Sequence, residues 1–584
     1  LALTVAACGG DDDADPSPND GDADTTEATD DSGQTDGSDD AEATDDAEAT
    51  DDSEATDDAS GSAEETSEPG ETSEHVLQVV MSEESPDLVP MTAGGQGQGQ
   101  VFQAIFMPLL QPDNNNQIFS RILESWEMSP DATVATLTLK PDIEWSDGTP
   151  MTSADVAMSL GIYLDASIAN MAGRIGGVLG QTEFNDGEAD EIAGLQIVDD
   201  LTVTVELETP NAPWLNNIAA LGEDLPILPS HVLGDVPHGE LLDHEYFQTV
   251  PVSSGPYKVV EFVAGQYVEL ERNDNWSLGT PGFEQVFMRV VSTDVMTAQL
   301  ETRELDFVSP LDPVDVERIE GIEGVTVGSA VGVAPDLWSL MHDDGSLDPR
   351  VRQAMLFAID REGICEQAML GYCTTPVTNI RQISPEWAIP TVEEYPDLIE
   401  YTFDPDRARE LLAEAEADGA WDPNTTLTFY HRPGRSYVDT AIAIAQAQMA
   451  DVGINWEIIN TDTGGLIDGI REQPIGTLDG FWVSGADFTI DPSAVETYTT
   501  CSSARTGANL ISYCRPELDE LWAAGRQTSV EEERAEVYHE AFRFLNADPA
   551  EIYLYVVNTI VAYDDRLQGV QPHGGVGQTY WTIG

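Results

Sequence analysis

The sequence predicts an α/β fold, and three patterns in the stretch 124–160 carry that prediction. Polar and apolar side chains alternate from Val134 to Leu139, which is the period of a half-buried strand. Asp147-Gly148 is a tight-turn dipeptide. Thr152 and Asp155 have the spacing of a capping box, which predicts the start of a helix. One face of that helix is apolar, at Val156, Leu160, Tyr163 and Leu164.

Further strands and helices are predicted along the chain. Alternating or β-rich runs predict strands within 75–80, 198–207 and 551–561. An aspartate followed by proline predicts helices that begin at Asp348-Pro349 and Asp404-Pro405. Ser529 with Glu532 predicts the start of a third helix, and the glycine-rich run 94–100 predicts a turn or loop.

The charge of the chain excludes some partners. Its 584 residues carry 23 basic and 109 acidic side chains, a formal net charge of −86. Phosphates would be repelled, so neither nucleic acid nor an anionic membrane surface is expected as a partner. No apolar run reaches the length of about 18 residues that a transmembrane helix needs.

The first 74 residues predict an anchor and a spacer. Residues 1–8 end in Val5-Ala6-Ala7-Cys8, which resembles the lipobox of a lipoprotein signal peptide, so Cys8 is expected to carry a diacylglycerol. The alternative is an ordinary cleavage site with a chance cysteine. Residues 9–74 repeat an acidic EATDD pattern and hold few apolar groups, so they are expected to be disordered. They would hold a folded domain away from a membrane, or be only a solvated tail.

No pattern indicates catalysis or a cofactor. The chain has no G-x-S-x-G, H-E-x-x-H, P-loop or dinucleotide-binding motif, and its eight histidines are scattered. A hydrolase that uses paired carboxylates is the enzymatic alternative. With 109 acidic residues, however, such a pair could be found anywhere. The protein is therefore expected not to be an enzyme and to need no cofactor or metal.

Several longer motifs resemble one protein family. The stretch 124–160 contains SWEMSPD and WSDGTPMTSADV, and 251–258 reads PVSSGPYK. VRQAMLFAIDR follows Asp348-Pro349 after one arginine, and DPDRARELLAEA begins at Asp404. In this order and spacing they resemble family 5 bacterial extracellular solute-binding proteins, which include the dipeptide-, oligopeptide- and nickel-binding proteins of ABC importers. The resemblance covers about residues 76–584.

The resemblance implies a two-lobed, periplasmic-binding-protein-like α/β fold of the class II type, with a ligand cleft between the lobes. The first lobe would comprise 75–290 and 551–584, and the second 291–550. The strands at 286–291 and 552–557 would then be the two hinge crossings. A hinge between two lobes is a common way to close around a ligand.

The resemblance also implies ligand-binding residues. The run 480–492 resembles the family's G-W-x-x-D-x-x-D-P loop, with one extra residue between Trp482 and Asp487. Asp487 would pair with a peptide α-ammonium, since charge-assisted bonds strengthen in a drier cleft, and Trp482 would line the pocket. Alternatively, Asp491-Pro492 caps a helix and Asp487 only accepts hydrogen bonds from backbone amides of the turn.

Two further residues are candidates for the ligand site. Arg435, in the run YHRPGR, lies where dipeptide-binding members present an arginine to the ligand carboxylate. The alternative is a surface arginine that pairs with one of many acids. Trp387 would line the pocket from a loop of the second lobe, or serve in ordinary packing.

The remaining cysteines predict two disulfides. With Cys8 lipidated, four of the five cysteines remain, an even number that outside the cell favours disulfides. Local pairing gives Cys365–Cys373 and Cys501–Cys514, and the second resembles a loop disulfide of the dipeptide-binding members. The alternative, a metal site, lacks C-x-x-C spacing and nearby histidine.

The function that the resemblance implies is capture of a small solute, foremost a short peptide, by a monomeric lipoprotein on the outer face of the cell membrane. The solute would pass to an ABC transporter permease. The alternatives are a non-peptide ligand such as a metal chelate or sugar, a partner that is a sensor, and the secreted hydrolase above.

Overall fold

The computed structural model describes residues 76–81, 85–92, 95–112, 117–332, 335–342, 347–378, 386–433, 435–461, 479–484, 491–503, 509–567 and 570. Among them no helix is both long and apolar enough to cross a membrane. Cys8, the spacer 9–74 and Asp487 lie outside the described residues.

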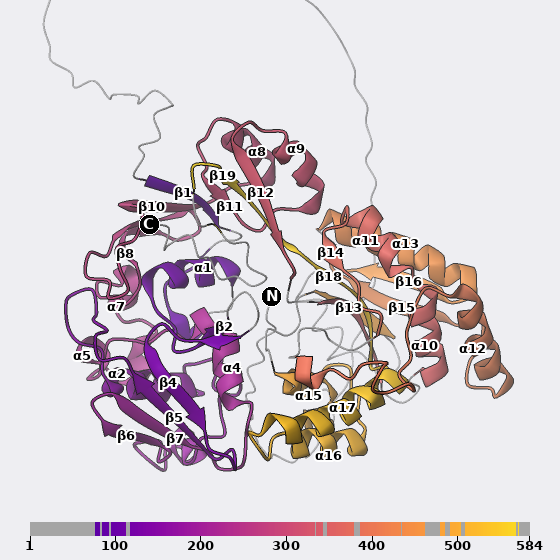
Figure 1. Cartoon of the computed structure of the whole chain (residues 1–584), viewed down its shortest axis with the longest axis horizontal. Helices are drawn as coiled ribbons and strands as arrows, with labels where there is room; N and C mark the ends of the chain where they lie inside the picture. The colour runs from indigo at the N-terminus through magenta and orange to yellow at the C-terminus, as the bar shows by residue number, and fades with distance from the viewer. Residues whose placement is uncertain are drawn as a thin grey trace, which may run out of the picture. The chain divides into compact units, whose positions relative to one another are not determined.

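A seven-stranded sheet, the first sheet, has the strand order β12-β19-β11-β1-β10-β9-β8 (Figure 1). Its central strand β1 pairs in parallel with β10 and β11, and both faces are buried: Leu77 packs in one core and Val80 in another. The bounds are β1 (Val76–Met81), β8 (Tyr257–Val263), β9 (Tyr267–Arg272), β10 (Gln285–Val290), β11 (Phe307–Val308), β12 (Val325–Ala330) and β19 (Thr559–Asp564).

A four-stranded antiparallel sheet, in the order β4-β5-β7-β6, contains the stretch from which the prediction began. Its strands are β4 (Leu123–Met128), β5 (Val134–Leu139), β6 (Leu195–Asp199) and β7 (Thr202–Glu206). The capping box is confirmed at the start of α2 (Ser153–Leu164), where Thr152 N donates to Asp155 Oδ2 at 2.7 Å. Asp155 Oδ1 also accepts from Ser230 N at 2.7 Å, so one buried carboxylate fixes two segments.

Short elements complete this part of the chain. The two-stranded sheet is β2 (Gln111–Pro112) with β3 (Ile118–Phe119). The helices are α3 (Gln181–Asn185), α4 (Trp214–Leu221), α5 (Ser230–Leu233), α6 (His238–Leu241), α7 (Tyr246–Thr249), α8 (Thr293–Glu301) and α9 (Val316–Glu320).

A six-stranded sheet, the second sheet, has the order β14-β18-β13-β17-β15-β16. Its strands are β13 (Pro335–Leu340), β14 (Cys373–Thr374), β15 (Thr426–His431), β16 (Asn455–Asn460), β17 (Gly480–Ser484) and β18 (Glu551–Val557). One core joins it to α10 (Pro349–Ala358), α12 (Pro405–Ala417) and α13 (Ser436–Val452). Another core joins it to α16 (Pro516–Gly525) and α17 (Glu531–Ala547), so helices cover both faces (Figure 1).

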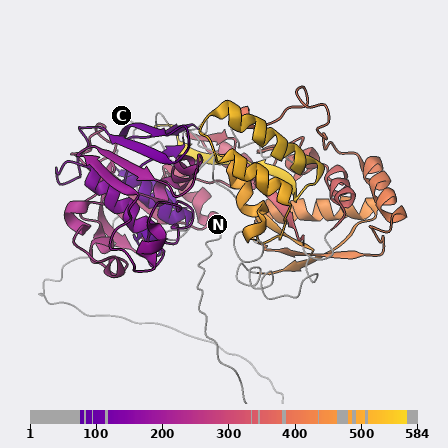
Figure 2. The ribbon, with the colours of Figure 1, turned by 90° about the horizontal axis from the view of Figure 1, so that it is seen from below.

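Two helices that pack on the second sheet begin at the predicted residues. Asp348 and Asp404 are the N-caps of α10 (Pro349–Ala358) and α12 (Pro405–Ala417), and each side chain accepts a backbone N–H. Figure 2 shows the last two helices (yellow), which pack against each other. The other helices are α11 (Arg361–Ala368), α13 (Ser436–Val452), α15 (Glu496–Thr499), α16 (Pro516–Gly525) and α17 (Glu531–Ala547).

The two sheets and their cores make the predicted two-lobed α/β fold, but the chain crosses between them at other places than expected. β10 and β18 each lie wholly within one sheet. The crossings are the connection from β12 to β13 and Asn558, which separates β18 from β19. Residues 291–330 therefore contribute strands to the first sheet, and 551–557 a strand to the second. We call the parts built on the first and second sheets the first and second lobes.

Two local predictions were wrong. The run 94–100 was expected to be a loop, yet Gln96 begins α1 (Gln96–Ile105), because Val101, Phe102 and Ile105 pack in the core and extend the helix back over the glycines. Ser529 does not cap α17, whose N-cap position is Val530. The Ser529 hydroxyl donates instead to Ser129 O of the first lobe at 3.1 Å.

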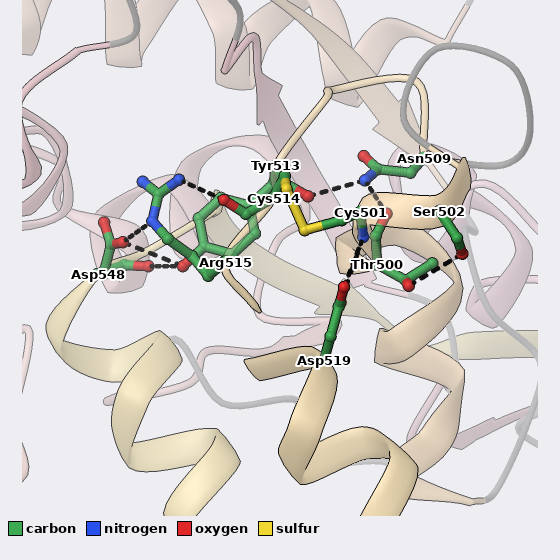
Figure 3. The surroundings of a disulfide bond; sticks show 9 residues. All are labelled: Thr500, Cys501, Ser502, Asn509, Tyr513, Cys514, Arg515, Asp519 and Asp548. Atoms are coloured by element: carbon green, nitrogen blue, oxygen red, sulfur yellow. Dashed lines mark hydrogen bonds and ion pairs between the residues drawn. A yellow bond between two sulfur atoms is a disulfide. The ribbon is translucent and has the colours of Figure 1, made fainter. Parts of the chain in front are cut away.

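Both predicted disulfides are present, Cys365–Cys373 and Cys501–Cys514. Figure 3 shows the second one between two anchored segments. Asn509 donates to Thr500 O and Tyr513 O, at 2.8 Å each, and Cys501 N donates to the Asp519 carboxylate at 3.2 Å. The loop is thus held by its covalent bond and by its own amide groups.

Asp548, beside this loop, joins three elements. Its carboxylate pairs with Arg352 of α10 (Pro349–Ala358) at 2.5 Å. Figure 3 shows its other two contacts: the pair with Arg515 at 2.8 Å and the hydrogen bond from Tyr513 Oη at 3.2 Å. Burial works to raise the pKa of the Asp548 carboxyl, but the two arginines outweigh it and hold that pKa below its usual range. Asp548 therefore fixes the turn between α17 and β18.

The first prediction concerns the capping box. We expect Asp155→Ala to lower the free energy of unfolding by about 2 kcal/mol, because it removes a cap and leaves Ser230 N without its buried acceptor. Urea unfolding followed by circular dichroism measures this. Asp190→Ala, at an exposed acid, is the control and should change nothing measurable. Equal midpoints for the two variants would contradict the assignment.

The second prediction concerns the pH dependence at Asp548. At pH 7, Asp548→Asn should cost about 3 kcal/mol, because Arg352 stays buried without its counter-charge. A carboxyl with a lowered folded pKa stabilises above its unfolded pKa of about 3.9, and this contribution is lost as the pH falls through the folded value. The difference between wild type and variant should therefore shrink below about pH 4.

Urea midpoints at pH 7 and pH 3 measure this difference. Asp418→Asn removes an exposed Arg350–Asp418 pair with a similar distance of 2.7 Å, and should cost no more than about 0.5 kcal/mol. A pH-independent difference for Asp548→Asn would refute the coupling.

Candidate functional site

Three parallel strands of the second sheet end at the same edge, which we call the carboxyl edge. β15 pairs in parallel with both β16 and β17, and the three end at His431, Asn460 and Ser484. In open α/β sheets ligands bind outside the carboxyl ends of such strands. Arg435 follows β15, and Asp487 belongs to the segment that follows β17. The two strands that precede these predicted residues in the chain therefore end at one edge.

Arg435 occupies the N-cap position of α13 and is exposed to solvent. Its Nη1 donates to Tyr437 Oη at 3.3 Å. Desolvation lowers the pKa of the Arg435 guanidinium, but Tyr437, Asp336 and Asp312 outweigh it and raise that pKa. Arg435 is thus a permanent cation that acids of both lobes already attract, since Asp336 belongs to β13 and Asp312 lies between β11 and β12.

Two buried groups lie behind Arg435. Asp336 pairs in register with Ser484 on one side and with Tyr555 on the other, so the antiparallel strands β13 and β18 also reach the carboxyl edge. Among the described residues, Tyr555 Oη has no hydrogen-bond partner, and burial raises the pKa of this phenol far above its usual value. The carboxyl edge therefore contains buried polar groups as well as the exposed Arg435.

Trp482 was expected to line the pocket, but the structure places it in the second-lobe core. It is 5% exposed and meets His431 in a T-shaped contact with ring centroids 5.8 Å apart. The reason is strand alternation: Phe481 points to the core on one face of the sheet and Trp482 to the core on the other. Helices cover both faces, so neither ring forms an open wall.

Trp387 lies in a different cluster, which we call the Asp491 cluster: Trp387, Asp491, Arg534, Tyr538 and Asn216. The half-buried Trp387 ring lies 5.4 Å from the Arg534 guanidinium carbon and 6.2 Å from the Tyr538 ring. These distances fit a cation–π contact. The described contacts of Trp387 thus lie in the Asp491 cluster, whereas Trp482 contacts His431 in the second-lobe core.

Asp491 is the centre of this cluster and confirms the helix-cap interpretation of Asp491-Pro492. Its Oδ1 accepts from Ser493 N at 3.0 Å and begins the 3₁₀ turn Pro492–Val495. Arg534 Nη2 donates to both carboxylate oxygens at 2.8 Å, and Asn216 Nδ2 donates to Oδ2 at 2.8 Å. The carboxylate is fully buried and held by these partners.

Sequence reasoning missed Arg534 and Asn216. They lie 43 and 275 positions from Asp491, and no short motif connects residues at such separations. The only available signal was the scarcity of basic residues, which makes any arginine in this chain worth placing.

The described residues offer no obvious metal centre. No group of three or more histidine, cysteine, aspartate or glutamate residues in the described ranges is arranged to hold a metal ion. The disulfide-bonded cysteines are not thiolates, which are the metal-binding form of cysteine.

Comparison with known proteins supports the fold and the family. The model of bacterial extracellular solute-binding proteins, family 5, matches residues 117–505. A putative ABC transporter peptide-binding protein of Brucella melitensis is 26% identical over 82% of this chain and 88% of its own.

Two similar proteins have solved structures with bound ligands. The oligopeptide-binding protein AppA of Bacillus subtilis is 24% identical over 74% of this chain and 77% of its own. Its structure with a nonapeptide has a TM-score of 0.66, at 20% identity over 85% of this chain and 96% of that one. NikZ of Campylobacter jejuni with Ni(L-His) has a TM-score of 0.67, at 20% identity over 86% and 97%. The chain belongs to the family 5 bacterial extracellular solute-binding proteins.

Proposed function

We propose that this protein captures a short peptide outside the cell and delivers it to the permease of an ABC importer. The observation that carries the proposal is the carboxyl edge, where the permanent cation Arg435 and the segment that contains Asp487 follow neighbouring parallel strands. A cation and an acid at one edge suit the two ends of a zwitterion. The peptide-binding relatives in Brucella and Bacillus support this ligand class.

In this proposal binding requires no chemical step. The ligand carboxylate pairs with Arg435 and competes with Asp312 for the guanidinium. Asp487 accepts hydrogen bonds from the α-ammonium of the ligand. Asp312 belongs to the first lobe and Arg435 to the second, so a ligand at Arg435 would lie where acids of both lobes converge. Closure of the lobes would exclude water and strengthen both ion pairs.

The cellular setting is also part of the proposal. A diacylglycerol on Cys8 would hold the protein at the outer face of the membrane, and the acidic segment 9–74 would let the monomeric domain reach its permease. A sensor in place of the permease would use the same binding step. A nickel chelate, as in NikZ, is the second ligand class, because such a ligand brings its own metal-binding groups.

The third prediction concerns the ligand itself. Native mass spectrometry of protein purified from its host should show added masses of short peptides, and calorimetry with synthetic dipeptides should give heat on binding. The reason is that a family 5 site with a cation and an acid retains zwitterions during purification. A co-purified nickel chelate or neutral glycan, together with no heat from dipeptides, would reject the peptide assignment.

The fourth prediction separates the two charged residues. Arg435→Ala should weaken dipeptide binding by about tenfold or more, because a charge-assisted hydrogen bond is lost. It should have little effect on a dipeptide with an amidated carboxyl end, which cannot use that arginine. Asp487→Asn should show the opposite selectivity, weakening the free-amino peptide and sparing its N-acetylated form.

Calorimetry with the three peptides measures both effects. Arg409→Ala, on the exposed face of α12, is the matched control and should bind like wild type. If Arg435→Ala weakens the acid and the amide equally, Arg435 does not contact the ligand carboxylate.

A further inference from the structure

Two segments of the first lobe, at Pro130 and at 212–216, contact two segments of the second, at Asp491 and at 526–529. Ala212 N donates to Arg526 O at 3.1 Å, and Ser529 N donates to Pro130 O at 3.4 Å. The third contact is the hydrogen bond from Asn216 Nδ2 to Asp491 Oδ2 at 2.8 Å. Of these three, only the last joins two side chains, and only it ends on a charge.

Asn216 is rigidly placed in the first lobe. It lies in α4, between Trp214 and Ile218, which are 0% and 1% exposed in the first-lobe core. Trp214 Nε1 also donates to Ile175 O at 2.7 Å, which fixes the first turn of the helix. Any movement of the first lobe therefore carries the Asn216 amide with it.

Asp491 is equally fixed in the second lobe. Arg534 neutralises it, is itself only 6% exposed in its side chain, and is held by Gly525 O at 3.0 Å and Tyr538 Oη at 3.0 Å. The carboxylate would keep Arg534 and Ser493 N if Asn216 withdrew. Breaking the hydrogen bond from Asn216 therefore leaves the Asp491 carboxylate paired, so this bond can form and break reversibly. Breaking the pair with Arg534 would leave a buried charge without its counter-charge.

The position of Asp491 in the chain gives this contact a functional meaning. Asp491 lies four residues after Asp487, and its side chain caps the turn that follows the ligand segment. A group that binds Asp491 from the opposite lobe therefore acts at the end of the segment that the proposed function assigns to the ligand.

We propose that Asn216 is a positioning residue for lobe closure: its hydrogen bond to Asp491 forms when the lobes meet and holds the first lobe against the second. The proposal rests on the proposed function for the ligand, but its contacts do not depend on which ligand binds. The acceptor is ionised and buried, so this bond is stronger than one between neutral groups. Its loss should shift the ratio of closed to open protein by about tenfold.

The test uses two interlobe amides as reporters. Ala212 N and Ser529 N each have their acceptor on the other lobe, so they exchange with solvent deuterium when the lobes separate. In the full chain without ligand, Asn216→Ala should make the Ser529 amide exchange about tenfold faster. Ser529 is far from position 216 in the chain, so this effect cannot come from local fraying of α4.

The matched control is Asn217→Ala, at a neighbouring α4 asparagine of similar exposure whose side chain makes no hydrogen bond to another described residue. It should exchange like wild type. Asn216→Asp places a second acid at the Asp491 carboxylate and should open the lobes further, seen as a larger radius of gyration in small-angle X-ray scattering. Wild-type exchange at Ser529 in Asn216→Ala, or unchanged scattering in Asn216→Asp, overturns the proposal.

A binding experiment with ligand distinguishes a failure of this proposal from a failure of the proposed function. With the synthetic dipeptides as probes, Asn216→Ala should weaken binding about tenfold, and Asn217→Ala should not. If no dipeptide binds even to wild type, the peptide function fails, and the exchange and scattering experiments still decide the role of Asn216. If dipeptides bind Asn216→Ala and wild type equally, closure does not depend on Asn216.

Discussion

Aspartates that pair with arginine connect parts of this protein that lie far apart in the chain. An unpaired buried carboxylate costs several kcal/mol, and the chain has just 23 basic residues for its 109 acids. Five of these cations pair with buried or partly buried aspartates at three sites: Arg534 at Asp491, Arg352 and Arg515 at Asp548, and Arg303 and Arg566 at Asp564. Elsewhere most acids remain in water, where they need no partner.

Two of these sites flank the second crossing between the lobes. Asp548 fixes the start of β18, and Asp564, 3% exposed in its side chain, fixes the end of β19. Asn558 lies between the two strands and outside both sheets. Asp548 and Asp564 thus hold the far ends of β18 and β19, on either side of the point at which the chain passes from the second lobe to the first.

The features that sequence predicted correctly are local ones. The capping box of Thr152 and Asp155, the caps at Asp348 and Asp404, and both disulfides involve partners at most 13 positions apart. Their physics is contained in a short window of the chain, so a pattern can reveal it.

The features that sequence missed depend on contacts across the fold. Ser529 has the spacing of a cap, but its hydroxyl reaches Ser129 of the other lobe. The hinge was misplaced because a strand pattern at 286–291 does not say to which sheet the strand belongs. Trp482 looked like a pocket wall because alternation in β17 puts an aromatic ring on each face, and sequence does not tell which faces helices cover. Asp487 stays a prediction, since it lies outside the described residues.

Charge also constrains which ligand this protein can take. A net charge of −86 repels free anions at long range, although salt screens that repulsion beyond about 10 Å. If the proposed site at Arg435 takes a carboxylate, a ligand that also carries a positive group avoids this long-range repulsion. A zwitterionic peptide meets that condition, and its ammonium would face an acid while its carboxylate faces Arg435, whose charge Asp312 and Asp336 already draw on. In this proposal, selection for ligands without net negative charge follows from the same scarcity of cations that makes each arginine pair important for the fold.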